Sequence, residues 1–277
     1  MLECVVNVSE GRDDAVLHDL ARAAGSCLLD VHRDPDHHRS VLTLAGADVE
    51  ESARTLAGAA VDAIDLRDHR GVHPRLGAVD VVPFVPLHDD GGPDQSAEGL
   101  RLAVAARDRF ARWAADELDL PCFLYGPERT LPDVWRGAFT TLTPDTGPST
   151  PHRTAGACAV GARHVLVAYN VWLDTADLST ARSLAAAVRG PRLRTLGLAT
   201  GGVTQVSCNL VDPLVLGPAD ALDAVQAAAH QVHVTVTRGE LVGLAPKAAL
   251  DGVDPARLAQ LGLDAAATLE ARLAARR

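Results

Sequence analysis

The sequence has very few aromatic residues and only one lysine. Phe, Trp and Tyr make up 3 % of its 277 residues, whereas 47 % are hydrophobic, so Val, Leu and Ala must fill most of the interior. Lys247 stands alone beside many arginines, a bias typical of a GC-rich genome rather than of a function. No apolar run reaches the roughly 18 residues that a membrane-spanning helix needs. The composition therefore predicts a globular protein that does not span a membrane.

A basic face is also missing. The formal net charge is −10 and Lys and Arg form no run, which argues against a nucleic-acid partner because phosphate binding needs a basic surface. A few local arginines can still set the potential of a pocket for a small anion. The N-terminus lacks the charged and apolar regions of a secretory signal. Five cysteines, an odd number within or beside apolar runs, are typical of reduced core residues in a cytoplasmic protein. They are Cys4, Cys27, Cys122, Cys158 and Cys208.

The stretch that most clearly predicts chemistry is residues 66–86, LRDHRGVHPRLGAVDVVPFVP. In it a polar loop runs directly into an apolar strand. Pro74 fixes its own φ and restrains His73, and Gly71 and Gly77 bracket the loop, so His73 is presented by a stiff backbone. An imidazole that titrates near neutrality on a rigid support suits a general base. The alternative is a surface loop that collects polar residues by chance.

Two further polar turns are candidates for ligand binding. The turn at residues 7–12 follows a short apolar strand and opens a helix, where it either binds a ligand at the helix N-terminus or supplies Ser9 or Asp13 as a cap. The hairpin loop at residues 33–39 contains His37 and His38. Adjacent residues point in different directions in an extended backbone, and no other Cys or His completes a ligand spacing. A solvated polar hairpin is therefore favoured over a metal site.

The order of predicted elements indicates two α/β units. A chain of 277 residues exceeds the usual size of one core. The second half has a strand at 164–173, a helix at 181–188, strands at 193–198 and 203–211, a helix from 218 and a strand at 232–242. This βαββαβ order is ferredoxin-like, and the first half reads similarly. We predict an α+β fold of two α/β sandwich subdomains, 1–158 and 159–277, with a substrate cleft between them.

Two local features are less regular. The strand at 79–85 contains Pro83 and is followed by Pro86, which predicts an edge or bulged strand. Residues 128–155 are rich in Pro, Thr and Gly and read as a long ordered loop; loops of that length are usually functional.

The motif HPRLGAVDVVPFVP resembles the His-Pro-Arg, Gly-Ala, Asp signature of the glutamate formiminotransferase family. Other segments resemble the family in the same order over nearly the whole chain to about Leu250. They are ECVVNVSEGR, LLDVHRDPDHHRSVLTLAG, CFLYG, PDTGPSTPHRTAGACAVGARHVLVAYNVWL, VTQVSCNLVD and GELVGLAPKAAL. The chain is thus similar to the transferase unit, without a cyclodeaminase domain.

The resemblance implies a cytoplasmic homodimeric transferase of histidine degradation and one-carbon metabolism. It would move a formimino group from N-formimino-L-glutamate to N5 of tetrahydrofolate, a co-substrate, without a metal. His73 stands at the position of the family's catalytic base. His38 and Arg39 stand where the family has Asn and Arg. The resemblance therefore implies that Arg39 contacts a substrate carboxylate. The residues expected to bind substrate or folate are Asn7, Arg12, Arg39, Arg70, Arg75, Asp80, Gly147, Pro148, Ser149, Thr150 and Gly156.

Several of these roles have alternatives. Asp80 would orient an imidazole, pair with Arg75 or cap a strand. The four arginines would bind carboxylates through bidentate pairs, or form ordinary surface salt bridges. Residues Gly147 to Gly156 match the family's folate-binding segment in position, but the residues in the middle of the segment differ from those of the family.

The sequence departs from the family between the helix near Val188 and the strand near Leu193. Full folate enzymes carry a longer basic, Gly-rich insertion there, whereas this chain has RGPRLR, and the next turn, at Gly201 and Gly202, is also altered. Two other functions therefore stay open. One is a formimino or formyl transferase with a different amine acceptor. The other is a folate- or small-molecule-binding relative with reduced activity, against which the complete His-Pro-Arg loop argues.

Overall fold

The computed structural model describes residues 1–276 and divides into two compact units. The first consists of residues 1–89 and 93–164, and the second of residues 90–92 and those from Val165 onward. Strand β6 (Cys158–Ala162) belongs to the sheet of the first unit. The subdomain boundary at 158/159 and the cleft between subdomains stay predictions. Within residues 1–276, no helix is long and apolar enough to cross a membrane.

The first unit is built on a six-stranded mixed sheet. Its other strands are β1 (Leu2–Val8), β2 (Leu28–Asp34), β3 (Arg39–Gly46), β4 (Val79–Pro86) and β5 (Cys122–Tyr125). The strand order is β2-β3-β1-β4-β6-β5. The first four strands pair antiparallel, and β6 runs parallel to both β4 and β5. The βαββαβ pattern predicted for this half is therefore present and is extended by two parallel strands.

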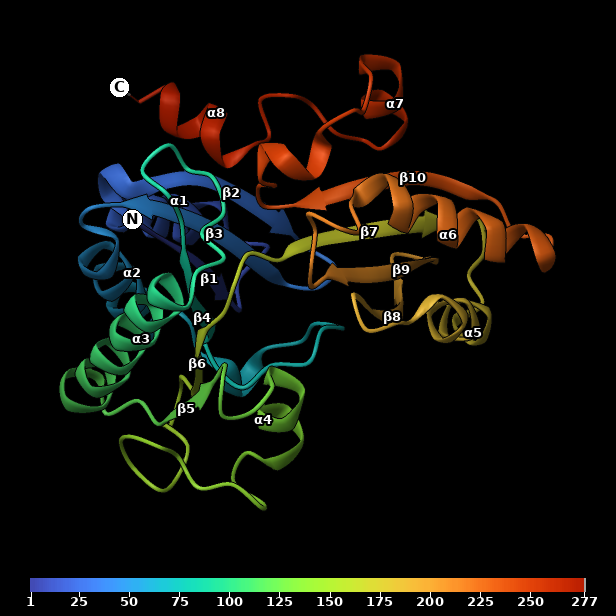
Figure 1. Ribbon diagram of the computed structural model, residues 1–277. Coiled ribbons are helices and arrows are strands. Elements are labelled where there is room, and N and C mark those ends of the chain that lie inside the picture. The colour runs from blue at the N-terminus through green and yellow to red at the C-terminus, as the bar shows by residue number, and fades with distance from the viewer. Residues whose placement is uncertain (277) are drawn as a thin grey trace. The chain divides into compact units, whose positions relative to one another are not determined.

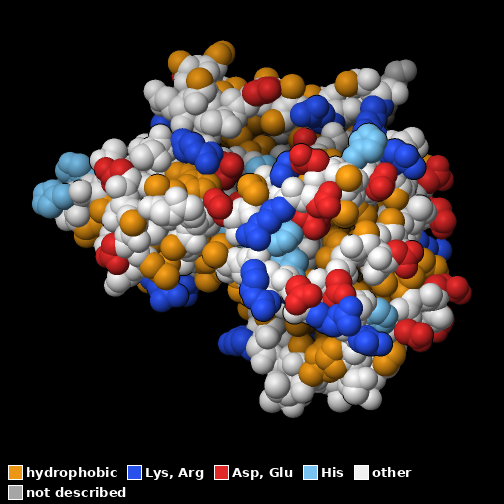
Figure 2. Space-filling view, turned by 180° about the vertical axis from the view of Figure 1, so that it is seen from behind, with side chains coloured by type: hydrophobic (Ala, Val, Ile, Leu, Met, Phe, Trp, Pro, Cys, Tyr) orange, Lys and Arg blue, Asp and Glu red, His pale blue; other side chains and the backbone are white. Residues whose placement is uncertain are grey.

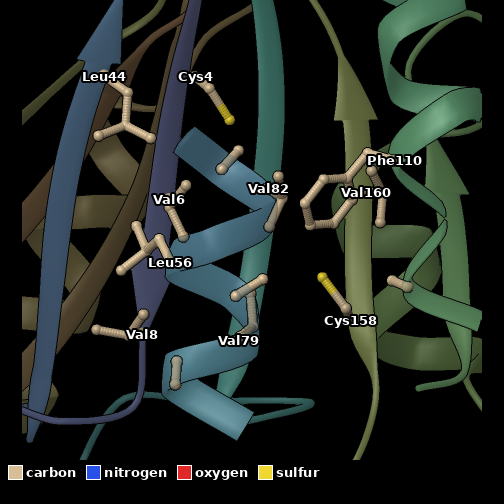
Figure 3. Close-up of a cluster of buried hydrophobic side chains, with 14 of the residues drawn as sticks. Cys4, Val6, Val8, Leu44, Leu56, Val79, Val82, Phe110, Cys158 and Val160 are labelled. Atoms are coloured by element: carbon tan, nitrogen blue, oxygen red, sulfur yellow. The ribbon is translucent and has the colours of Figure 1, made fainter. Parts of the chain in front are cut away.

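Three helices, α1 (Asp14–Ala23), α2 (Val49–Ala63) and α3 (Ala97–Leu118), belong to the main core of this unit (Figure 1). Leu56 of α2 points among Val6, Val8 and Val79 of the sheet (Figure 3). Small residues on the buried faces of α2 and α3 let both helices approach the strands closely. This explains how a chain poor in aromatic residues fills its core. All five cysteines are buried and free, as expected.

A fourth helix, α4 (Leu131–Gly137), packs on the other face of the sheet. Side chains alternate along a strand, so Val82 faces the main core while Val81 belongs to a second cluster with Val134 of α4. The helix begins at a capping box between Thr130 and Asp133. The prediction of a continuous loop over 128–155 is therefore wrong in its first third. Trp135 therefore lies on a helix rather than in a loop.

The prolines of β4 predict an edge or a bulged strand, and the structure shows the bulge but not the edge position. It lies between β1 and β6, and all of its residues are buried. Pro83 pairs with Gly161 of the parallel neighbour, and the pairing of β1 with β4 shifts register between Asn7 and Val8. The predicted irregularity is thus present. A continuous apolar run fits a central strand better than an edge, and this outweighs the proline signal.

The second unit has the ferredoxin-like order that the sequence predicts. Its elements are β7 (Val167–Leu173), α5 (Leu178–Val188), β8 (Leu193–Thr200), β9 (Val203–Leu210), α6 (Pro218–Gln231) and β10 (Val236–Val242). They form an antiparallel sheet in the order β10-β7-β9-β8, with α5 and α6 packed in its hydrophobic core. Two short helices follow, α7 (Pro255–Gln260) and α8 (Leu269–Ala274). The α+β fold with two ferredoxin-like units is confirmed.

Candidate active site

The candidate site lies in the first unit, where the His-Pro-Arg loop enters β4. The end of the loop is fixed by backbone hydrogen bonds to two other segments. Ala78 N donates to Ala155 O at 2.9 Å, and Ala157 N donates to Leu76 O at 3.0 Å. On the other side, Ser9 N donates to Ala78 O at 2.8 Å. The loop is therefore held between the turn after β1 and the segment before β6.

Two glycines allow this close approach. A Cβ on Gly77 would lie 2.0 Å from Ala157 O, and one on Gly156 would lie 2.3 Å from Leu76 O. Gly156 also has φ +71°, in the left-handed region that side chains disfavour. Gly156, predicted to bind folate, therefore provides a close backbone contact for the His-Pro-Arg loop.

Asp80 ties the loop to three strands. Its side chain is fully buried, and its Oδ1 accepts from Leu76 N at 2.5 Å and from Gly77 N at 3.4 Å. Its Oδ2 pairs with Arg39 Nη1, and Arg39 Nη2 donates to Asn7 Oδ1 at 2.8 Å. The structure thus brings together three of the predicted residues, Asn7, Arg39 and Asp80. Asp80 pairs with Arg39 rather than with Arg75.

His73 is half-buried and its ring has a defined tautomer. Nδ1 lies 2.6 Å from the carbonyl oxygen of Pro74. Because a carbonyl only accepts, Nδ1 carries the hydrogen and the neutral ring keeps its lone pair on Nε2. Burial lowers the pKa of His73 well below its ordinary value, and the Arg39 guanidinium lowers it further, while the bond to Pro74 opposes the shift. The imidazole is therefore neutral near pH 7, with its Nε2 lone pair available to accept a proton.

Two aromatic rings flank His73. The His37 ring, from the hairpin between β2 and β3, lies with its centroid 5.8 Å from that of His73. Trp135 of α4 approaches edge-on at 6.0 Å. Neither contact can be predicted from the sequence, because each depends on a hairpin or a helix that folds back over the loop.

Arg75 and two further histidines make contacts that hold the loop in place. Arg75 Nη1 contacts the His69 ring, and its Nη2 donates to His73 O at 2.7 Å. His69 stacks on His38 with centroids 4.0 Å apart. Burial, followed by the charge of Arg75, lowers the pKa of His69 to about 4, and burial also lowers the pKa of His38. Among residues 1–276 no group of three His, Cys, Asp or Glu side chains is arranged to hold a metal.

The turn after β1 is closed by its own acidic residues. Glu10 Oε1 accepts from three successive backbone N–H groups, and Asp13 caps α1 by accepting from Ala15 N and Val16 N. Arg12 is exposed, with its Nε donating to Pro35 O at 2.9 Å. The capping alternative is thus present for Asp13, and Arg12 stays accessible to a solute.

The remaining predicted residues take no part in the contacts around the His73 ring that are described above. Arg70 is exposed and donates to His69 O at 2.9 Å. Gly147 has φ +83° and lies against Leu120 O, next to the start of β5. Pro148 is half-buried, and Ser149 and Thr150 are exposed. Cationic side chains alternate with anionic ones over the face shown in Figure 2.

This geometry suits removal of a proton from a bound amine. The neutral ring of His73 has a lone pair on Nε2 that can accept a proton, and the guanidinium of Arg75 lies beside the same loop. The arrangement contains the elements of acid–base transfer chemistry within one unit.

Comparison with known proteins agrees with this chemistry. Residues 1–163 match the family model described as the formiminotransferase domain, N-terminal subdomain. The glutamate formimidoyltransferase of Streptococcus pyogenes is 35 % identical over 90 % of this chain and 90 % of its own. The glutamate formimidoyltransferase of Thermoplasma acidophilum is 33 % identical over 99 % of this chain and 97 % of its own. The formimidoyltransferase-cyclodeaminase of Rattus norvegicus is 33 % identical over 91 % of this chain but only 51 % of its own. The chain therefore belongs to the formiminotransferase family of transferase enzymes.

Proposed function

We propose that this protein transfers the formimino group of N-formimino-L-glutamate to N5 of tetrahydrofolate, with His73 as general base. Two relatives that match nearly the full chain are named glutamate formimidoyltransferase. The observation that carries the proposal is the His73 ring, half-buried, neutral and fixed with its lone pair on Nε2. A base with a pKa below the working pH is ready to accept a proton without first losing one.

The reaction needs the base when the acceptor attacks. N5 of the folate forms a bond to the formimino carbon and becomes positively charged unless its proton leaves. His73 takes that proton as the bond forms. Since Asp80 and the Gly77–Gly156 contact hold the loop in place, the imidazole is already oriented before substrate binds.

Carboxylate groups of both substrates need cationic partners. Arg12 and Arg70 are exposed next to the loop and are free to form bidentate pairs with them. Arg39 and Asn7 act differently, because they are already bound in the pair with Asp80. We assign the pterin end of the folate to the surroundings of His73 and to the Gly147–Gly156 segment.

A second acceptor class is favoured by one feature of the second unit. Helix α5 ends at Val188 and β8 begins at Leu193, so the connection is a tight turn in which Gly190 and Leu193 bond to each other. Arg189 donates to Thr195 O at 2.7 Å. Arg192 donates to Asp212, so both arginines of this short turn are already bound, which favours an enzyme that passes the formimino or formyl group to another amine.

The test is a direct assay of the purified protein with N-formimino-L-glutamate and monoglutamyl tetrahydrofolate. We expect glutamate release to equal formation of 5-formiminotetrahydrofolate, both measured by mass spectrometry. Glutamate release that occurs only with a different amine would establish the second acceptor class. No consumption of the donor with any acceptor would contradict both.

A further inference from the structure

We propose that His37 is the general acid of the transfer and donates a proton to the glutamate nitrogen as that nitrogen leaves the formimino carbon. This role rests on the proposed function, because it assigns the second proton of the same reaction. The departing amine of an amidine is strongly basic and leaves poorly unless it is protonated. A second acid–base group beside His73 meets that need.

His37 is paired with a carboxylate inside its hairpin. Its side chain is 8 % exposed, and its Nδ1 lies 3.1 Å from Asp34 Oδ2. The other carboxylate oxygen of Asp34, Oδ1, accepts from His37 N at 2.8 Å. Asp34 therefore fixes both the backbone and the ring of His37. A proton donated by this ring comes from Nε2, because Nδ1 faces the carboxylate.

The charges around the two rings differ in sign. His37 faces the carboxylate of Asp34, which favours the protonated imidazole. His73 faces Arg39 and Arg75, which favour the neutral imidazole. Two adjacent titratable groups whose surroundings favour opposite protonation states are the arrangement expected of an acid and a base.

The other charged groups near the pair do not reverse this assignment. Arg75 Nη2 lies 3.4 Å from the carbonyl oxygen of His37, whereas Asp34 contacts the His37 ring itself. Asp80 is neutralised by Arg39. Trp135, on the other element that packs against His73, carries no charge. The ring centroids of His37 and His73 are 5.8 Å apart, so the two groups lie close enough to act on the same substrate.

The step balances in atoms and electrons. As a bond forms between the folate N5 and the carbon of the protonated formimino group, the C=N π pair moves to the imino nitrogen and the N5 proton goes to His73 Nε2. That pair then re-forms the C=N bond while the bond from the carbon to the glutamate nitrogen breaks, the electron pair of the broken bond stays on the glutamate nitrogen, and His37 supplies its proton. His73 has gained one proton and His37 has lost one, so a proton transfer between the neighbouring rings, directly or through water, restores the starting state.

A purely structural role for His37 would be to shape the hairpin through Asp34. The pH dependence of kcat separates the two roles, since an acid must be protonated and therefore produces a loss of rate on the alkaline side. The experiment measures kcat and KM with N-formimino-L-glutamate and tetrahydrofolate from pH 5 to about 9.5, a range that brackets histidine titration. It compares wild type, His37→Gln, Asp34→Asn and the control Asp36→Asn, which removes an exposed charge from the same hairpin.

We expect His37→Gln to lower kcat about 10²–10⁴-fold and to abolish the alkaline loss of rate. Asp34→Asn keeps an oxygen for the turn but loses the charge, so the alkaline limb moves to lower pH. Asp36→Asn matches wild type. If His37→Gln does not fold, as judged by circular dichroism, the Asp34→Asn profile decides alone. An unchanged alkaline limb in the folded variants, with changes only in KM or thermal stability, overturns the proposal. Absence of transfer by wild type refutes the proposed function itself, before any variant is measured, and this role with it.

Discussion

Arg39 and Asp80 form a buried ion pair that reaches across a strand. They lie on β3 and β4, which are separated by β1, and Asn7 of β1 accepts a second bond from the same guanidinium. The Asp80 side chain has no exposed surface and that of Arg39 is 10 % exposed. Because Asp80 also accepts from the backbone of the His73 loop, the pair couples the sheet to the proposed base.

Removing the charge of Asp80 should therefore destabilise the protein strongly. Asp80→Asn leaves Arg39 buried without its partner, and breaking a buried pair in this way costs about 3–5 kcal/mol. Urea unfolding measures the loss. The matched control is Glu98→Gln, which breaks an exposed pair with Arg101 and should cost no more than about 1 kcal/mol. Equal costs for the two variants would contradict the structural role of Asp80.

The sequence predicted the second unit almost completely, because its strands and helices have clear apolar periodicity. For β4 it predicted an edge or a bulge; the bulge is present, whereas the strand lies inside the sheet because its long apolar run is buried only in a central position. In the site, His73 could be identified from its stiff loop. The contacts of His37, His69 and Trp135 could not, because they arise where a hairpin and a helix meet that loop.

A methyl group at Gly77 should disrupt the site. The Cβ of Gly77→Ala would lie 2.0 Å from a backbone oxygen, so the loop must shift and activity should fall at least about 10²-fold, as expected for a misplaced catalytic group. Gly58→Ala is the control, because it lies in α2 with open space around its Cβ. That variant should be stabilised by about 0.4–1 kcal/mol and keep its activity. Steady-state kinetics and thermal unfolding of both variants test this; full activity of Gly77→Ala would show that the contact is dispensable.

His69 should make the free energy of unfolding depend on pH in the acid range. Burial and the charge of Arg75 lower its pKa to about 4 in the folded state, against about 6.5 when unfolded. Between these values the unfolded chain binds the extra proton, so stability is full above pH 6.5 and falls as the pH drops towards 4. Urea titrations across that window should show a shallower fall in His69→Gln. The pKa values of His38 and His73 are also lowered, so these residues keep part of the dependence of stability on pH in the variant. Identical slopes in variant and wild type would contradict the assignment.

The short turn between α5 and β8 should make folate affinity nearly independent of tail length. In a longer basic loop each added glutamate could gain a charge-assisted hydrogen bond worth about 1.5–3 kcal/mol. Residues 189–192 form a tight turn in which Arg189 already donates to Thr195 O and Arg192 to Asp212. Calorimetry with mono- and pentaglutamyl tetrahydrofolate should give affinities within tenfold. A larger preference for the long tail would refute this, and binding of neither form would support the second acceptor class.

The central claim is that the neutral imidazole of His73 removes the acceptor's proton. Its most direct test is the rate of formimino transfer by His73→Ala, measured beside wild type at saturating substrates and with circular dichroism as a check on folding. His73 lies on a half-buried loop rather than in the core, so the variant should fold normally. We predict that kcat falls about 10²–10⁴-fold. A folded variant that keeps more than about a tenth of wild-type activity would contradict the role of His73 as general base.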